Sequence, residues 1–334
     1  MERFGRLATF LGYATAWMLP NPVSAFLISL GNFARWALVF HPISHGALDR
    51  IKGVPHRYTS DGFAQGKRRF LDWFDWILPE AWAVEHNHLH HYFLGTEKDP
   101  DVVARNARYI RELKAPLFVR TALAFLMISI WKPFYYAPNT LAELRHQKGE
   151  SESNLIGAAN WNPLKPAGFQ LWAKCLLPYA LARFVLIPAF FFPLGAKAVM
   201  AVFLNSLLAE IFTNLHSFIA IGPNHTGDDI PTFSTPARGR AEHYLRQIVG
   251  TVNFPSSGNV ADFFYGGLNY QIEHHLWPEA SLLQCQQASP RLKEICARYG
   301  VPYKEEPIFK RVWITIRTVA GDCPSVELPS GRIL

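Results

Sequence analysis

Four long apolar runs alternate with polar stretches along the chain. The first two, residues 7–19 and 23–40, are separated by Pro20-Asn21-Pro22. Because prolines interrupt helices and form turns, we expect a helical hairpin here. The other two runs, residues 171–193 and 196–221, are joined by a short Pro-Leu-Gly turn and predict a second hairpin. A membrane crossing needs about 20 residues, so the first run must tilt or extend into its flanks to cross.

A fifth apolar stretch, residues 117–137, is interrupted by Arg120 and Lys132. We therefore expect an interfacial helix rather than a crossing. An even number of crossings also leaves the polar segments on both sides of this stretch on the same side of the membrane. The prediction is an all-α integral membrane protein of one domain, with four transmembrane helices in two hairpins, about 7–40 and 171–221. A cytoplasmic helical cap comprises residues 41–170 and 222–334.

The composition supports a membrane protein. Hydrophobic residues make up 49% of the chain and charged residues 18%, below the quarter or so that is usual in soluble proteins. The formal net charge is +7, but no basic helix or aromatic-interleaved motif accompanies it, which argues against nucleic-acid binding. A cytoplasmic face that meets anionic lipid is the simpler explanation of this charge.

Basic residues also predict the orientation of the chain. Arg3 and Arg6 precede the first hairpin, and several arginines and lysines between residues 50 and 69 follow it. The positive-inside rule then puts both ends of this hairpin, and with four crossings both termini, in the cytoplasm. The first apolar run leads into the second without a small-residue cleavage site, so we expect it to stay as an anchor. The four cysteines stand singly and predict reduced thiols.

Polar residues inside the second hairpin need partners. Arg183 lies in its first run, whereas Asn205, Glu210 and Asn214 lie in its second. Buried polar groups in a membrane are costly and often functional. Antiparallel helices joined near residue 194 bring Arg183 close to Asn205 and Glu210, so we favour an interhelical pair over substrate binding.

The chain has 13 histidines, and their grouping is unusual. Three clusters each lie beside an apolar hairpin. On an α-helix, His86 and His90 share one face and His91 lies about 100° around it, so this trio can serve two adjacent metal ions. His88 points to the opposite face. The clusters are His41 with His45; His86 with His90 and His91; and Gln271 with His274 and His275.

Any one of these clusters alone is more often a set of hydrogen-bonded or exposed histidines than a metal site. Three of them at hairpin edges make coincidence improbable. Adjacent histidines are also better accommodated as neutral metal ligands than as two cations. Seven histidines are too many for one tetrahedral zinc ion and fit two ions of higher coordination number, which favours iron and oxygen chemistry. No carboxylate-rich E-x-x-H pair indicates a ferritin-like site.

The segment Gln271-Ile272-Glu273-His274-His275-Leu276-Trp277-Pro278 closely resembles the third histidine box of membrane fatty acid desaturases, particularly front-end desaturases with glutamine in first place. The segment His41-Pro42-Ile43-Ser44-His45 is similar to the first box. His86-Asn87 with His90-His91, followed by Asp99-Pro100-Asp101, is similar to the second. Order and spacing match from about residue 10 to residue 310. Pro42 departs from the pattern, because it follows the first ligand where the helix should continue.

This resemblance implies a mushroom-shaped helical membrane protein with two iron ions under a cytoplasmic cap and O2 as co-substrate. It also implies a further ligand after the last crossing, for which His225, next to Asn224, fits better than His216. The substrate would be a fatty acid or an acyl carrier. With no cytochrome b5 domain in the sequence, we expect a separate electron donor of the ferredoxin, rubredoxin or cytochrome b5 type.

Members of such families perform several reactions after the same hydrogen abstraction. We expect fatty acid desaturation, with hydroxylation or oxidative decarboxylation to a terminal alkene as alternatives on the same site. From a different class, a membrane zinc hydrolase could also gather histidines near a bilayer. A metal transporter is a weaker alternative, because the boxes do not lie along the crossings.

Overall fold

The computed structural model describes residues 1–151, 157–323 and 326–328. The protein is mostly helical, as predicted, with one short parallel strand pair, β1 (Pro231–Phe233) and β2 (Val326–Leu328). The chain divides into two compact units. Part of the predicted cap, residues 152–156, lies outside the described residues, and so does the C-terminal end from residue 329. The single-domain interpretation stays a prediction.

The first unit comprises residues 1–44, 53–85 and 128–217. Short π-helical segments join several of its helices end to end, at residues 34–40, 171–176 and 182–186. Its helices are α1 (Glu2–Ala16), α2 (Pro22–Phe33), α3 (His41–Ser44), α4 (Arg69–Asp72), α5 (Pro79–Trp82), α10 (Ala137–Gln147), α11 (Ala158–Trp161), α12 (Pro166–Gln170), α13 (Leu177–Leu181), α14 (Ile187–Phe190) and most of α15 (Ala196–Ile221).

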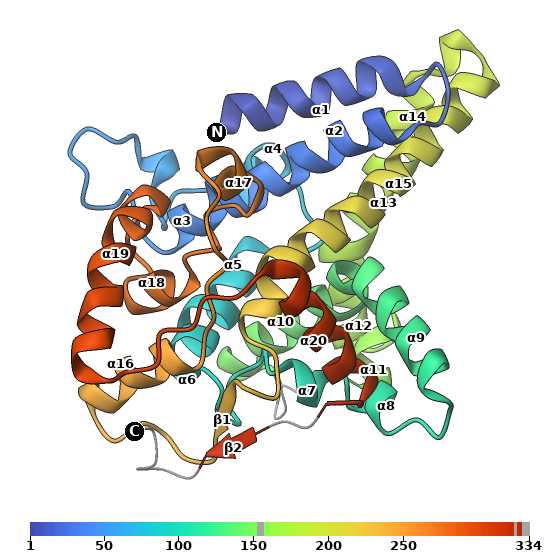
Figure 1. The fold of residues 1–334 in the computed structure, drawn as a ribbon. Coiled ribbons are helices and arrows are strands. Elements are labelled where there is room, and N and C mark those ends of the chain that lie inside the picture. The colour runs from blue at the N-terminus through green and yellow to red at the C-terminus, as the bar shows by residue number, and fades with distance from the viewer. Residues whose placement is uncertain (152–156, 324–325, 329–334) are drawn as a thin grey trace. The chain divides into compact units, whose positions relative to one another are not determined.

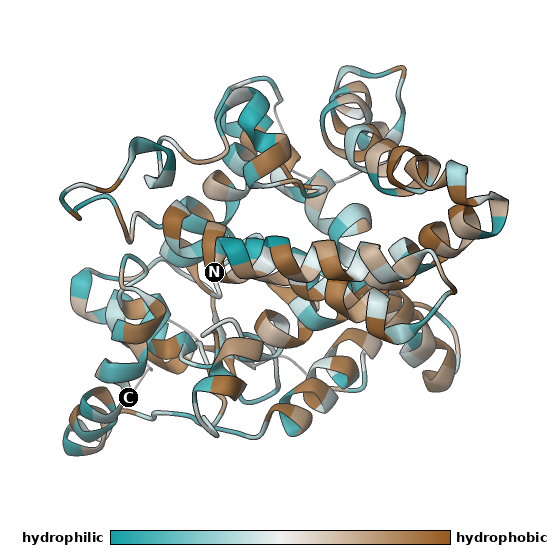
Figure 2. Ribbon diagram, turned by 90° about the horizontal axis from the view of Figure 1, so that it is seen from above, coloured by the Kyte–Doolittle hydropathy of each residue, from teal (hydrophilic) through white to brown (hydrophobic). Residues whose placement is uncertain are grey.

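Helices α1 and α2 lie side by side and are joined by the predicted proline turn (Figure 1). The side chain of Asn21 accepts a hydrogen bond from the Ser24 amide at 2.8 Å, and Pro22 begins the helix, so both residues favour a helix start here. The helices approach closely at Gly12, where an added Cβ would lie 2.6 Å from Ile28. Figure 2 shows the hydrophilic start of α1 and more hydrophobic residues along the rest of it.

Within the part of the chain that the structure describes, three helices are long and apolar enough to cross a membrane. They are Pro22–Ser44, Pro166–Phe190 and Ala196–Asn224, and they include three of the four predicted crossings. The remaining one is not confirmed, because α1 has 15 residues and falls short of the roughly 20 residues that a crossing needs.

The stretch expected to be interfacial is a second candidate for a further crossing. Helix α9 (Leu117–Ser129) and the helix Lys132–Gln147 are bent by 82° and together could form one broken span. Lys132, whose charge argued against a crossing, is only 1% exposed and forms a 2.6 Å ion pair with Asp75. Its charge is therefore balanced inside the protein and need not face lipid.

A polar network connects the helices of the first unit. As predicted, the Arg183 guanidinium pairs with Glu210, at 3.4 Å, and it also donates to Tyr13 and Asn32. The predicted contact with Asn205 is wrong. The Asn205 amide donates instead to the carbonyl of Ala16, the last residue of α1, and to that of Leu19 in the following turn. The last carbonyls of a helix have no partner within it and need such donors.

The second unit comprises residues 45–52, 86–127 and 218–334. A core of Ile248, Ile272, Leu276, Leu292 and Cys296 packs α16, α18 and α19 together. All four cysteines of the chain are free thiols, as predicted. The helices of this unit are α6 (His91–Phe93), α7 (Val103–Asn106), α8 (Arg108–Arg111), most of α9, α16 (Arg240–Val249), α17 (Asn259–Phe264), α18 (Gln271–Leu276), α19 (Leu282–Tyr299) and α20 (Ile308–Ala320).

Candidate metal centre

The second histidine box lies on a wide helical turn. Residues Ala83–His90 are π-helical, so their backbone hydrogen bonds join residues five apart rather than four. His86 and His91 consequently meet, with 3.3 Å between their Nε2 atoms. An α-helical turn would have paired His86 with His90, but the Nδ1 atom of His90 lies 2.9 Å from Asp99 instead. His88 is exposed, as its place in the sequence predicted.

The third box lies on the short buried helix α18. Its residue Glu273 is 0% exposed and accepts hydrogen bonds from Asn253 at 2.8 Å and from Tyr303 at 2.7 Å. Asn253 also accepts a hydrogen bond from the Ile272 amide at 2.9 Å. These bonds fix α18 in the second unit, so the adjacent His274 is presented by a rigid element.

The first box lies at a helix end. His41 is buried at the start of α3, in the first unit, and His45 follows this helix directly. One helical turn separates the two residues, so both side chains leave the same side of the helix.

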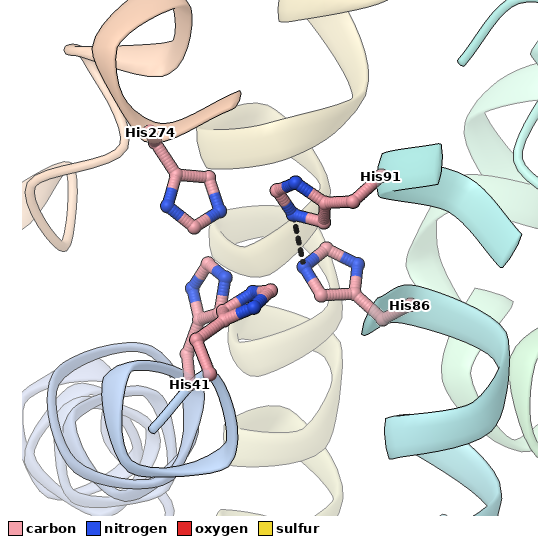
Figure 3. A group of neighbouring side chains, drawn as sticks. His41, His86, His91 and His274 are labelled. Atoms are coloured by element: carbon pink, nitrogen blue, oxygen red, sulfur yellow. Dashed lines mark hydrogen bonds between the residues drawn. The ribbon is translucent and has the colours of Figure 1, made fainter. Parts of the chain in front are cut away.

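Four histidines of the second unit form what we call the first histidine group: His45, His86, His91 and His274. Their ligand atoms all lie within 4.8 Å of one another. The rings of His45 and His91 have centroids 4.5 Å apart, and those of His91 and His274 are 4.7 Å apart. Figure 3 shows the rings of His86, His91 and His274 pointing toward one another from different segments. Donor atoms at this spacing could hold one metal ion.

The second histidine group consists of His90, His225 and His275, whose ligand atoms also lie within 4.8 Å of one another. His225 follows a short turn after α15. His216, the rival ligand, lies inside α15 and stacks on Phe33 with ring centroids 3.7 Å apart. The described residues therefore bring His225, and not His216, to a group with metal-binding geometry.

The two groups are adjacent. The ring of His91 stacks on that of His275, with 4.2 Å between centroids and an interplanar angle of 17°. His90 and His91 are neighbours in sequence but belong to different groups. The second box therefore contributes to both groups, as a trio serving two adjacent ions would.

Outer hydrogen bonds orient two rings of the second group. The Nδ1 atom of His90 lies 2.9 Å from Asp99, and that of His275 lies 2.9 Å from the side-chain oxygen of Gln247. A ring that donates through Nδ1 leaves the lone pair of Nε2 for a metal. These two Nε2 atoms are buried and have no hydrogen-bond partner among the described residues. Buried, oriented and unused nitrogens fit a bound metal ion.

The electrostatics of the rings agree with this fit. Burial, together with neighbouring imidazoles, lowers the pKa of His91 and His275 far below its usual value. Burial and the nearby His90 lower the pKa of His225 in the same way. The neutral form favoured in this way is the one that binds metal. Burial alone would also lower the pKa of His90, but the carboxylates of Asp99 and Asp101 outweigh burial and raise it.

Two further side chains adjoin the groups. The amide of Gln271, predicted as a ligand, lies 2.9 Å from the Nε2 atom of His225. Asp101 forms a third possible metal-binding set with His86 and His90. The Asp101 carboxylate is therefore an oxygen donor beside His90 of the second group, whereas Gln271 faces His225 with its amide nitrogen.

Gln247 was missed in the sequence. It lies on α16, far from the boxes along the chain, and nothing in its neighbouring sequence indicates a role. Asp99 had a signal, because it belongs to the Asp-Pro-Asp segment that follows the second box, but not an assigned role.

Comparison with known proteins adds independent information. The model of a family described as fatty acid desaturase matches residues 15–307. This range includes all three boxes and His225.

Curated relatives are desaturases. An NADPH-dependent stearoyl-CoA 9-desaturase of Mycobacterium tuberculosis is 31% identical over 118 residues, which cover 34% of this chain and 27% of the relative. A delta(8)-fatty-acid desaturase of Arabidopsis thaliana is 34% identical over 97 residues, covering 29% and 20%. An acyl-lipid (7-3)-desaturase of Rebecca salina is 26% identical over 326 residues, covering 93% and 65%. The matched part of the chain thus spans less than two thirds of each relative.

Proposed function

Because this chain belongs to the fatty acid desaturase family, we propose that it desaturates a fatty acyl chain with dioxygen at two iron ions. The observation that carries this proposal is the pair of adjacent histidine groups, whose members are buried except for the partly exposed His45 and His225, and which are bridged by the stacked rings of His91 and His275. Each histidine group would hold one of the two ions. Two ions in contact with such neutral nitrogen ligands suit a redox reaction better than hydrolysis at a single zinc ion.

We assign the predicted ligands to the two ions. The first ion would be bound by His45, His86, His91 and His274, and by His41 through its place one helical turn before His45. The second ion would be bound by His90, His225 and His275, and Gln271 would either complete this site or orient His225 by a hydrogen bond. The iron would supply the oxidant for an unactivated C–H bond, which no side chain can provide.

The side chains have three tasks in this proposal. Burial lowers the pKa of His91, His225 and His275, so these three imidazoles stay neutral and each keeps a ring lone pair for a metal. Asp99 and Gln247 keep the rings of His90 and His275 in the orientation in which Nε2 faces the metal. Burial of the groups keeps bulk water away from the reaction.

The reaction balances with an external donor. Forming one C=C bond from two CH2 groups removes two hydrogen atoms, and with O2, two electrons and two protons the products are the alkene and two water molecules. We propose a separate electron donor of the ferredoxin, rubredoxin or cytochrome b5 type, and a fatty acid or acyl carrier as substrate.

We further propose that the protein crosses the membrane four times, with both termini and the histidine groups on the cytoplasmic side. Arg3 and Arg6 at the start of α1 support a cytoplasmic N-terminus by the positive-inside rule. Helix α1 would cross with local thinning of the bilayer, because its 15 residues cover about 22 Å at 1.5 Å per residue. Labelling a single cysteine near the N-terminus with an impermeant reagent in sealed vesicles of known orientation tests this arrangement. Labelling from the side opposite the cytoplasm would contradict it.

The central test combines metal analysis with product analysis. The purified full chain should contain about two irons and convert a labelled fatty acid only with oxygen and a reductant. Loss of two hydrogens identifies desaturation, gain of one oxygen hydroxylation, and loss of one carbon decarboxylation. His274→Ala should abolish conversion, whereas His146→Ala, at an exposed histidine, should not. Zinc in place of iron, with activity in the absence of oxygen, would overturn the proposal in favour of a hydrolase.

A further inference from the structure

A buried arginine of the C-terminal helix holds the loop that carries His225. Arg311 lies on α20 and is 0% exposed. Arginine is rarely buried completely unless its charge and its donors are matched. The partners of Arg311 therefore indicate what it does in the fold.

Two of these partners are main-chain carbonyls on either side of His225. The Nε atom donates to the Pro223 carbonyl at 3.3 Å, and Nη2 donates to the Thr226 carbonyl at 2.5 Å. The third nitrogen, Nη1, donates to Asp229 at 2.8 Å. A planar guanidinium has its donors in a fixed fork, so it sets the relative positions of the groups that it binds.

The loop has little freedom beside this arginine. A Cβ added at Gly227 would lie 2.8 Å from Arg311 Nη2, so the backbone packs directly against the guanidinium. From the opposite direction, the Asn224 side chain donates to the Leu268 carbonyl at 2.9 Å, and the Asn224 carbonyl accepts from the Val252 amide at 3.0 Å. The main chain around His225 is therefore held from two sides, by α20 and by the segments near Val252 and Leu268.

The charge of Arg311 is balanced by two carboxylates. Besides Asp229, Glu306 lies 3.2 Å from Nη1. Burial would raise the pKa of Asp229, but its hydrogen bond and ion pair with Arg311, together with Lys304, outweigh burial and lower it. The arginine and its partners thus form a charge-balanced unit and need no external anion.

We propose that Arg311 is a positioning residue for the second metal site. By holding the loop around it, Arg311 keeps His225 next to His90 and His275. Helix α20 begins at Ile308, directly after the family match ends at residue 307, so a segment outside the matched region completes the site. The inference rests on the proposed function in one respect, that His225 binds a metal. Without Arg311, residues 223–226 would shift and the second group would lose one of its three histidines. The first group contains no residue of this loop.

The test counts metal ions in the full chain. Metal-free protein in detergent is titrated with Co2+, whose visible absorption reports each bound ion, and iron content is measured separately. We expect two ions in the unmodified chain. Arg311→Met should keep one ion and bind the other about 10- to 100-fold more weakly, the usual effect of losing an outer partner of a metal ligand. Arg317→Met is the matched control, because Arg317 lies on the same helix but is half-exposed and pairs with Asp322.

A conservative variant separates positioning from charge balance. Arg311→Lys keeps the charge, but one ammonium group cannot hold the Pro223 and Thr226 carbonyls and Asp229 in the same fork. It should therefore lose second-site affinity as Arg311→Met does. Wild-type affinity for both ions in either variant would overturn the inference.

A milder change covers the case in which Arg311 variants do not fold. Asp229→Asn removes the charged partner of Nη1 at a partly exposed position, and should lower the affinity for the second ion without unfolding the chain. Unchanged affinity in this folded variant would likewise overturn the inference. Failure of the unmodified chain to bind any ion would refute the proposed function instead.

Discussion

Replacing Asp99 by asparagine should weaken metal binding at the second histidine group. The carboxylate is 2% exposed, lies 2.9 Å from His90 Nδ1, and accepts a second hydrogen bond from the Gly95 amide at 2.7 Å. Asparagine keeps a similar shape and one oxygen, but it removes the negative charge. The ring of His90 then donates to a neutral acceptor, so its Nε2 atom becomes less basic and is less firmly oriented toward the metal.

The size of the effect follows from two independent magnitudes. A hydrogen bond to a charged group contributes about 1.5–3 kcal/mol to stability. Loss of an outer partner of a metal ligand costs about 10- to 100-fold in affinity, which corresponds to about 1.4–2.8 kcal/mol. We therefore expect one of two ions to bind ten to a hundred times more weakly. The other ion should be unaffected, because the first group contains no ring that is hydrogen-bonded to Asp99.

The assay is a Co2+ titration of the metal-free full chain against a competing chelator, repeated anaerobically with Fe2+. Asp322→Asn is the control, because this carboxylate forms a half-exposed ion pair with Arg317, and such pairs contribute about 0–1 kcal/mol. Two ions bound to Asp99→Asn with wild-type affinity would refute the reasoning. Equal weakening of both ions would also refute it, because it would mean that Asp99 supports the whole fold rather than one ring.

Three other predictions follow from the same structure. His225→Ala should remove about one iron per chain by elemental analysis, whereas His216→Ala should retain both; the reverse would exchange their roles. In the metal-free chain, His91, His225 and His275 have a pKa well below 6.5, so these groups take up protons on unfolding at acidic pH. The free energy of unfolding should therefore decrease as the pH falls below about 6.5. The raised pKa of His90 opposes this trend but concerns a single group, and a Tm higher at pH 5.5 than at pH 7.5 would contradict the expectation. Arg183→Met leaves Glu210 buried without its cation and should destabilise the folded chain by about 3–5 kcal/mol, measured by thermal unfolding in detergent, with an unchanged Tm as the contrary result.

Local sequence was sufficient for many of the helices. Asn21 and Pro22 begin α2 as expected, because capping and proline geometry involve only neighbouring residues. The runs at 171–193 and 196–221 likewise form helices that are long enough to cross a membrane. The ion pair of Lys132 could not be predicted from local sequence, because its partner Asp75 lies 57 positions earlier in the chain and no local pattern connects them.

The candidate site shows the same limit more sharply. The spacing of the boxes identified the histidines that converge in the second unit, but a spacing rule for α-helices paired His86 with His90. The choice between an α-turn and a π-turn is a matter of one hydrogen bond per residue, and packing around the segment decides it.

By itself, the sequence determined that apolar runs form helices, that histidines cluster at their ends, and which histidines are candidates for metal ligands. These properties depend on residue type and on neighbours within one or two helical turns. Only the tertiary structure decided how the imidazoles divide into two groups, that His225 rather than His216 joins them, and that Asp99, Gln247 and Arg311 support them. Such contacts join residues distant in sequence, and their geometry depends on how whole segments pack.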